Sequence, residues 1–114
     1  MEKDHSENIV KVGNEILNQD VKNIAKEKLG EIVEVMLKKE TGDIAYVVVS
    51  CGGFLGVGEK LFAFPWRDFH YDASEKCFIL NIDKDRLDAL PGFDKNHWPE
   101  KAENIYQAGQ SGEL

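Results

Sequence analysis

The segment Ile44–Cys51, with the sequence IAYVVVSC, constrains the fold of this chain more than any other. Its β-branched and aromatic residues are typical of a β-strand, whose side chains alternate between two faces. One face carries Ile44, Tyr46 and Val48, and the other carries Ala45, Val47, Val49 and Cys51. Because both faces are apolar, this strand is expected to lie either between two layers of the protein or in a contact between subunits.

Further strands are predicted on both sides of this segment. Within Leu29–Leu37, apolar and charged residues alternate as in a strand with one buried face. The polar residues 39–43 then supply a turn, so the two strands form a hairpin. Pro65 cannot donate to a strand ladder and indicates a corner after the next strand. The strands expected after the hairpin are Leu61–Phe64, Arg67–Tyr71 and Cys77–Ile82.

Two segments lie outside this series of strands. The segment Ile16–Lys28 is ambiguous: Val21 and Ile24 have helical spacing, but the apolar residues around its polar centre also fit a short strand. The pattern alone favours a helix. A second, short helix is predicted for residues 83–90, where Asp83 can cap the N-terminus. Short strands joined by polar turns predict a small antiparallel barrel or sandwich.

The length of 114 residues suits a single domain, and 42% apolar residues suffice for a folded core. We expect a flexible N-terminal arm in residues 1–14, one folded domain in residues 15–90 and a C-terminal tail in residues 91–114. In the tail, Phe93 and Trp98 are expected to pack on the folded domain or on a second subunit.

The charge of the chain argues against direct binding to nucleic acid. Its formal net charge is −7, whereas such binding depends on clustered Lys and Arg side chains. No segment approaches the about 18 apolar residues of a membrane-spanning helix, and the N-terminus lacks the pattern of a signal peptide. We therefore expect a cytoplasmic protein without a membrane span. Cys51 and Cys77 lack the spacing of a zinc or redox motif and are expected to be buried free thiols.

The glycine-rich segment Ser50–Lys60, SCGGFLGVGEK, is similar in composition to a phosphate-binding loop. A Walker loop requires a lysine directly after its last glycine, but Glu59 occupies that position. A dinucleotide-binding loop opens a helix, whereas the residues after Gly58 continue as a strand. We therefore expect the glycines to form a corner, with Phe54 and Leu55 either folded over the core or offered to a partner.

The remaining polar residues show no pattern of a catalytic or metal site. The three histidines, His5, His70 and His97, are not spaced so that two would share one face. Neither Ser50 nor Cys51 lies in a nucleophile elbow. We expect no catalytic residue, no metal and no cofactor.

Several features in order resemble the PRC-barrel domain. They are Leu29-Gly30-Glu31-Ile32, the Thr41-Gly42 turn, the loop from Gly52 to Gly58, and Phe64-Pro65-Trp66. The segment LDALPGFDKNHWP is similar to the tail that often follows this domain. The resemblance runs from about Ile16 to Pro99.

This resemblance implies an all-β fold: a small barrel of about six mostly antiparallel strands with one short C-terminal helix. It places the first strand at Leu17–Val21. Related domains occur in the photosynthetic reaction centre H subunit and in a ribosome maturation factor. This chain lacks the membrane helix of the first and the RNA-processing domain of the second, so we expect it to inherit neither role.

The family resemblance implies a module that binds other macromolecules without catalysis. We expect a protein-interaction or assembly module that forms a homodimer, because both apolar faces of the strand Ile44–Cys51 must be covered. The candidate partner contacts are Phe54, Leu55, Trp66, Phe93 and Trp98. Two alternatives remain: an RNA-processing or ribosome-associated factor acting through a ribosomal protein, and a small-ligand-binding or enzymatic protein that uses the Gly52–Gly58 loop and Cys51.

Overall fold

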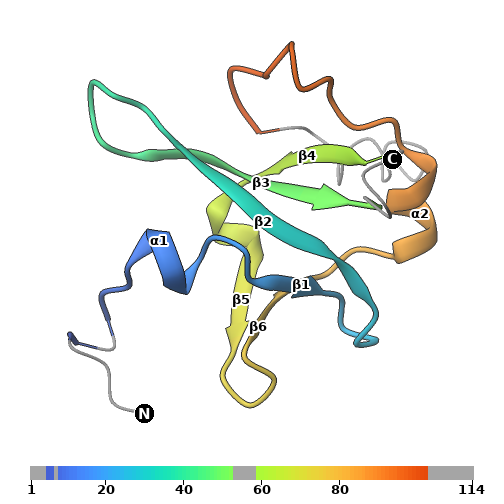
Figure 1. The fold of residues 1–114 in the computed structure, drawn as a ribbon, viewed down its shortest axis with the longest axis horizontal. Helices are drawn as coiled ribbons and strands as arrows, with labels where there is room; N and C mark the ends of the chain where they lie inside the picture. The colour runs from blue at the N-terminus through green and yellow to red at the C-terminus, as the bar shows by residue number, and fades with distance from the viewer. Residues whose placement is uncertain (1–4, 7, 53–58, 103–114) are drawn as a thin grey trace, which may run out of the picture.

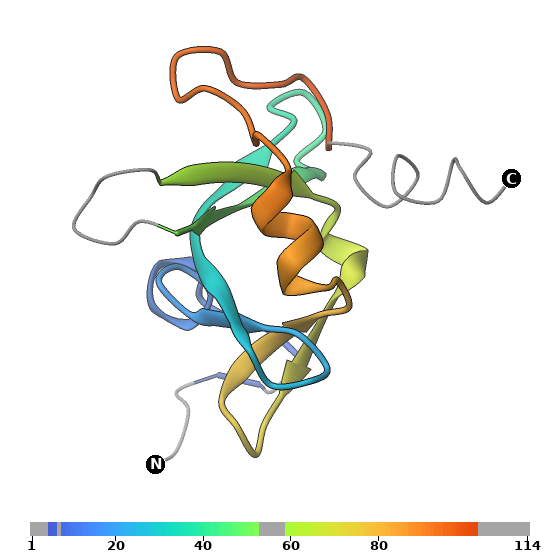
Figure 2. The same cartoon turned by 90° about the vertical axis from the view of Figure 1, so that its right-hand side faces the viewer.

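The computed structural model describes residues 5–6, 8–52 and 59–102, which form one strongly curved sheet (Figures 1 and 2). Its strands are β1 (Asp20–Lys22), β2 (Lys28–Leu37), β3 (Ile44–Cys51), β4 (Lys60–Phe64), β5 (Phe69–Asp72) and β6 (Cys77–Leu80). Their order in the sheet is β4-β3-β2-β1-β6-β5. The β1–β6 pair is parallel and the others are antiparallel. The predicted small, mostly antiparallel β-fold is confirmed, although no ladder among the described residues closes the sheet between β4 and β5.

Among the described residues, three short helical segments accompany the strands: α1 (Val12–Glu15), the 3-10 turn η2 (Trp66–Asp68) and α2 (Lys84–Ala89). The predicted C-terminal helix is confirmed as α2, and the Asp83 side chain caps it by accepting the Arg86 backbone N–H at 3.2 Å. The helix α1 was not expected. Figure 2 shows α2 lying across one opening of the curved sheet, where the buried Leu87 joins the core.

The helix that the pattern favours in Ile16–Lys28 is wrong. The structure has the three-residue strand β1 there, and the carbonyl of Ile32 accepts the Asn18 N–H at 2.7 Å just before it. On its two edges β1 pairs with β2 and with β6, so Val21 lies opposite Gly30 and Phe78. The pairing of β1 with β6 connects residues far apart in the sequence, and a local pattern cannot reveal it.

The main core fills the inside of the curved sheet. All strands contribute to it, and α2 and the segment before β1 close it. Its largest fully buried side chains include Phe62, Phe64, Ile32 and Leu80. Aromatic contacts continue around the corner after β4, where the rings of Phe64 and Phe69 meet edge to face at 6.1 Å.

A second, smaller cluster lies on the side of β3 and β4 that points away from the main core. It consists of Tyr46, Val48 and Ala63, which are at most 2% exposed, and we call it the outer face. The C-terminal segment 93–102, which we call the strap, lies against it: Phe93 and Ala102 pack on the cluster. In Figures 1 and 2 this segment is coloured orange to red and follows α2. The second apolar face of the Ile44–Cys51 strand is therefore covered within the chain, and this removes the reason for which the sequence indicated a subunit contact.

Gly30 provides a test of how tightly β2 and β3 approach each other. A Cβ atom at this position would overlap the backbone carbonyl of Ser50 and would lie 3.1 Å from Cys51 Sγ. A backbone carbonyl cannot rotate away, so we expect Gly30→Ala to lower the free energy of unfolding by about 2 kcal/mol or more in chemical denaturation.

Gly13→Ala is the matched control, because a Cβ atom there has no neighbour within 4 Å. It should leave stability unchanged or raise it by up to about 1 kcal/mol, since alanine favours helix over glycine. Equal effects of the two substitutions would contradict the close approach at Gly30.

Candidate functional site

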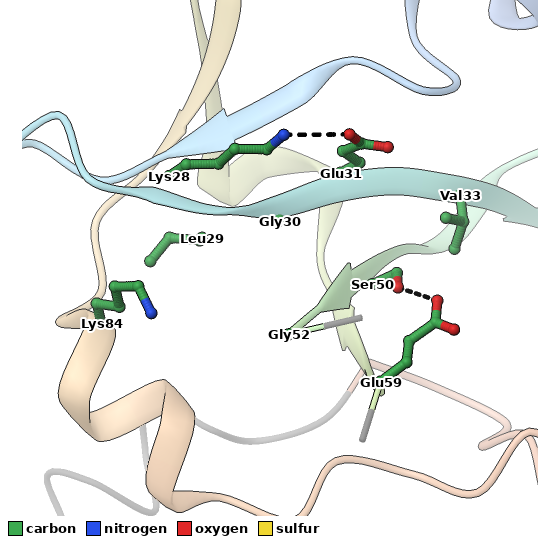
Figure 3. Close-up of a pocket in the computed structure, with 9 residues that line it drawn as sticks. All are labelled: Lys28, Leu29, Gly30, Glu31, Val33, Ser50, Gly52, Glu59 and Lys84. Atoms are coloured by element: carbon green, nitrogen blue, oxygen red, sulfur yellow. Dashed lines mark hydrogen bonds and ion pairs between the residues drawn. The ribbon is translucent and has the colours of Figure 1, made fainter. Parts of the chain in front are cut away.

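A groove of about 520 Å³ lies between the start of β2, the end of β3 and α2 (Figure 3). Its polar lining comes from Lys28 and Glu31 of β2, Ser50 of β3, Lys84 of α2, and Glu59, which precedes β4. Two cationic and two anionic side chains therefore meet the same space. The charges balance, so the groove does not favour a ligand of either sign.

Each charged side chain of the groove already has a partner. Lys28 Nζ lies 3.1 Å from Glu31 Oε2 and 3.2 Å from Asp20 Oδ1, and these carboxylates raise the pKa of Lys28. Lys84 Nζ lies 3.0 Å from Asp88 Oδ2, which raises the pKa of Lys84. The hydroxyl of Ser50 donates to the carboxylate of Glu59 (Figure 3). These pairs satisfy the groups that a ligand would otherwise bind.

Cys51, the candidate nucleophile, is buried at the end of β3. Only 3% of it is exposed, and burial, assisted by the nearby Asp88 carboxylate, raises the pKa of its thiol to about 12. A nucleophilic cysteine requires the thiolate, which this environment disfavours. Burial also raises the pKa of Cys77. The prediction of two buried free thiols is confirmed.

The glycine-rich loop falls largely outside the described residues. This applies to Phe54 and Leu55, two of the five candidate partner contacts, and to residues 53–58 as a whole. The described flanks show Gly52 with a φ of 73° and strand β4 beginning at Lys60. The prediction that a strand rather than a helix follows the loop is confirmed.

The other three candidate contacts occupy two places. Trp66 is half-buried at the corner after β4, with its ring centroid 6.2 Å from Phe69 and 5.9 Å from Phe78. Phe93 and Trp98 lie together in the strap, with ring centroids 5.1 Å apart. Trp98 is 38% exposed. The structure therefore pairs Phe93 with Trp98 and assigns Trp66 to the main core.

The residues that receive the strap were not identified from the sequence. Phe93 N–H donates to the Leu61 carbonyl at 2.8 Å, and the Tyr46 hydroxyl donates to the Pro99 carbonyl at 2.7 Å. Lys60 Nζ donates to the carbonyls of Asp88 and Leu90 at 2.6 and 2.9 Å, which secures the end of α2 beside β4. The available signal was the second apolar face of Ile44–Cys51, but it could not show which segment covers that face.

The three histidines lie in separate elements. His5 contacts Glu15 at 2.9 Å, His97 contacts Asp94 at 3.3 Å, and His70 is exposed on β5. Within residues 5–6, 8–52 and 59–102, no three His, Cys, Asp or Glu side chains are grouped to hold a metal ion. In the same part of the chain, no helix has the length and hydropathy to span a membrane.

A curved six-stranded sheet with a filled interior and a charge-balanced groove defines a small β-barrel-type module. The family model of the PRC-barrel domain matches residues 11–87. The chain belongs to the PRC-barrel domain family. A search of curated proteins finds no match. The strap lies C-terminal to the matched residues.

The burial of Cys51 predicts slow thiol chemistry. In the folded Cys77→Ala variant, where Cys51 is the remaining thiol, we expect a disulfide reagent to react at least about a hundredfold more slowly than after denaturation. Cys51→Ala tests Cys77 in the same way. Rapid reaction of native Cys51, as fast as a free thiol, would contradict its burial and raised pKa.

Proposed function

We propose that this chain is a non-catalytic protein-interaction or assembly module that acts in the cytoplasm and forms a homodimer. The observation that carries the proposal is the end of the β2–β3 hairpin, which projects from the rest of the sheet (Figure 1). Apolar side chains are exposed there. Membership of the PRC-barrel family supports it, because these domains are general modules that often mediate protein interactions.

The hairpin projects because its neighbours are short. The ladder between β2 and β1 ends at Glu31, and the ladder between β3 and β4 begins at Val47. Beyond these points, Leu37 and Ile44 are paired in register, and they are 59% and 37% exposed. An apolar pair at the end of a projecting hairpin is accessible to a partner protein and favourable to bury.

The non-catalytic part of the proposal rests on the groove and on Cys51. The charged groups of the groove are paired with one another or with neighbours, and the Cys51 thiol is buried and protonated at neutral pH. A general acid–base pair or an activated nucleophile needs groups that are accessible and poised to exchange a proton.

The test is an affinity pull-down with the intact chain, followed by measurement of the affinity for the recovered partner. We expect Leu37→Ser to weaken that affinity about tenfold, which corresponds to about 1.4 kcal/mol. Ile24→Ser is the matched control, because Ile24 is 67% exposed in the turn after β1. It should leave the affinity unchanged.

Equal binding by wild type and Leu37→Ser would remove the hairpin from the proposed contact surface. Recovery of ribosomal subunits would instead favour the ribosome-associated alternative.

A further inference from the structure

The outer face is an apolar surface that a thin segment covers. Val48 and Ala63 are 0% exposed although they point away from the main core. Most residues of the strap, by contrast, are exposed. The face is therefore deeply buried although most of the strap is exposed, and the side chains that pack on it are Phe93 and Ala102 of the strap and Val33, Met36, Ala45 and Leu61 of the sheet.

The strap is attached to the sheet near its two ends. The N–H of Phe93 bonds to Leu61, and the carbonyl of Pro99 accepts the Tyr46 hydroxyl. The side chains of Phe93 and Ala102 add the apolar contacts. A cover attached near its ends can open locally while the rest of the sheet stays folded.

The middle of the strap holds its own shape. The side chain of Asp94 accepts a hydrogen bond from the backbone N–H of Asn96 at 2.9 Å. The backbone carbonyl of Asp94 accepts one from the backbone N–H of His97 at 2.8 Å. Trp98 Nε1 donates to the Lys95 carbonyl at 2.6 Å. These bonds lie within the strap, so a released strap can bind elsewhere with little reorganisation.

A short connection joins α2 to the strap. Lys60 holds the carbonyls of Asp88 and Leu90, so the chain is fixed to the domain as far as Leu90. Pro91 and Gly92 follow. Gly92 has a φ of 71°, and a Cβ atom at this position would lie 2.6 Å from the carbonyl oxygen of Leu61. A change of the backbone angles of Gly92, which has no side chain to restrict them, would detach the strap without disturbing α2.

We propose that the strap exchanges between two copies of this chain, so that the strap of each copy covers the outer face of the other. This inference rests on the proposed function, because it names a second copy as one partner of the module. The structure already shows that the strap fits the face, and a second copy offers an identical strap. Every interaction that the strap makes within one chain can form again between the two chains, which gives a symmetric dimer.

Exchange depends on the protein concentration and on how often the strap leaves the outer face. Within one chain the strap competes at an effective concentration on the order of 1 mM, so exchange requires protein at comparable concentration. Because the face must first open, dimers formed in this way should persist after dilution.

The test uses two full-length variants with complementary damage. Phe93→Asp damages the strap, and Leu61→Lys damages the surface that receives it. Dimers of either variant alone contain two damaged contacts. A mixed dimer contains one intact contact and one in which the new aspartate faces the new lysine. After incubation at about 1 mM and dilution, native mass spectrometry should show at least about five times more mixed dimer than either homodimer.

Two outcomes would overturn the exchange. One is equal dimer formation by wild type, by each variant and by the mixture, which places the dimer contact elsewhere. The other is a monomer in every sample.

Tyr46→Phe gives a second test that does not depend on those variants folding well. It removes the hydroxyl that bonds to Pro99 but keeps the ring in the outer face. That bond exists in both the closed monomer and the exchanged dimer, so the dimer fraction should not change. The rate at which isotope-labelled and unlabelled subunits mix should rise several-fold.

Tyr71→Phe is the matched control, because Tyr71 is 55% exposed on β5. It should mix at the wild-type rate, and an unchanged rate in Tyr46→Phe would overturn the exchange. A failure here is distinguishable from a failure of the proposed interaction module: a monomer that still captures its partner through Leu37 loses the exchange and the homodimer but keeps the interaction with the partner.

Discussion

The short connection between β4 and β5 is the constraint on which the rest of the structure depends. These strands are the two edges of the sheet, yet only residues 65–68 separate them in sequence. Phe64 and Phe69 can therefore lie at most about 18 Å apart, because each residue spans at most about 3.6 Å. The edges of a flat six-stranded sheet would be about 24 Å apart. The sheet must curve, and the packing of Trp66 against Phe69 fixes the corner.

The curvature gives the two faces of β3 different surroundings. Val47 and Val49 point into the closed core, and Tyr46 and Val48 point outward. Curvature alone cannot bury both faces, so the outer one needs a separate cover, which the strap supplies. Residues 11–87, which the family model matches, thus leave an apolar surface on which Phe93 and Ala102 pack. The proposed partner contact uses the exposed hairpin end, and the proposed strap exchange uses this outer face.

Local signals in the sequence were sufficient for much of the fold. Alternation located β2, the run of β-branched and aromatic residues located β3, the break at Pro65 marked the corner, and Asp83 marked the start of α2. They failed at β1, where three residues are too few to show a period and pairing with β2 and β6 decides the structure. The sequence also showed that both faces of the Ile44–Cys51 strand are apolar, so each face must pack against another part of the protein. It could not show that the second cover begins near Phe93, because the contact between Tyr46 and Pro99 depends on how the chain returns across β4.

The most direct test of this account is a nuclear Overhauser measurement on the isotope-labelled full chain. We expect cross-peaks from the ring of Phe93 to the side chains of Tyr46, Val48 or Ala63, and from the ring of Tyr46 to Pro99. These cross-peaks should appear whether the strap belongs to the same chain or to a second copy. Their absence, with Val48 and Ala63 accessible to a soluble paramagnetic probe, would contradict the claim that the strap covers the outer face.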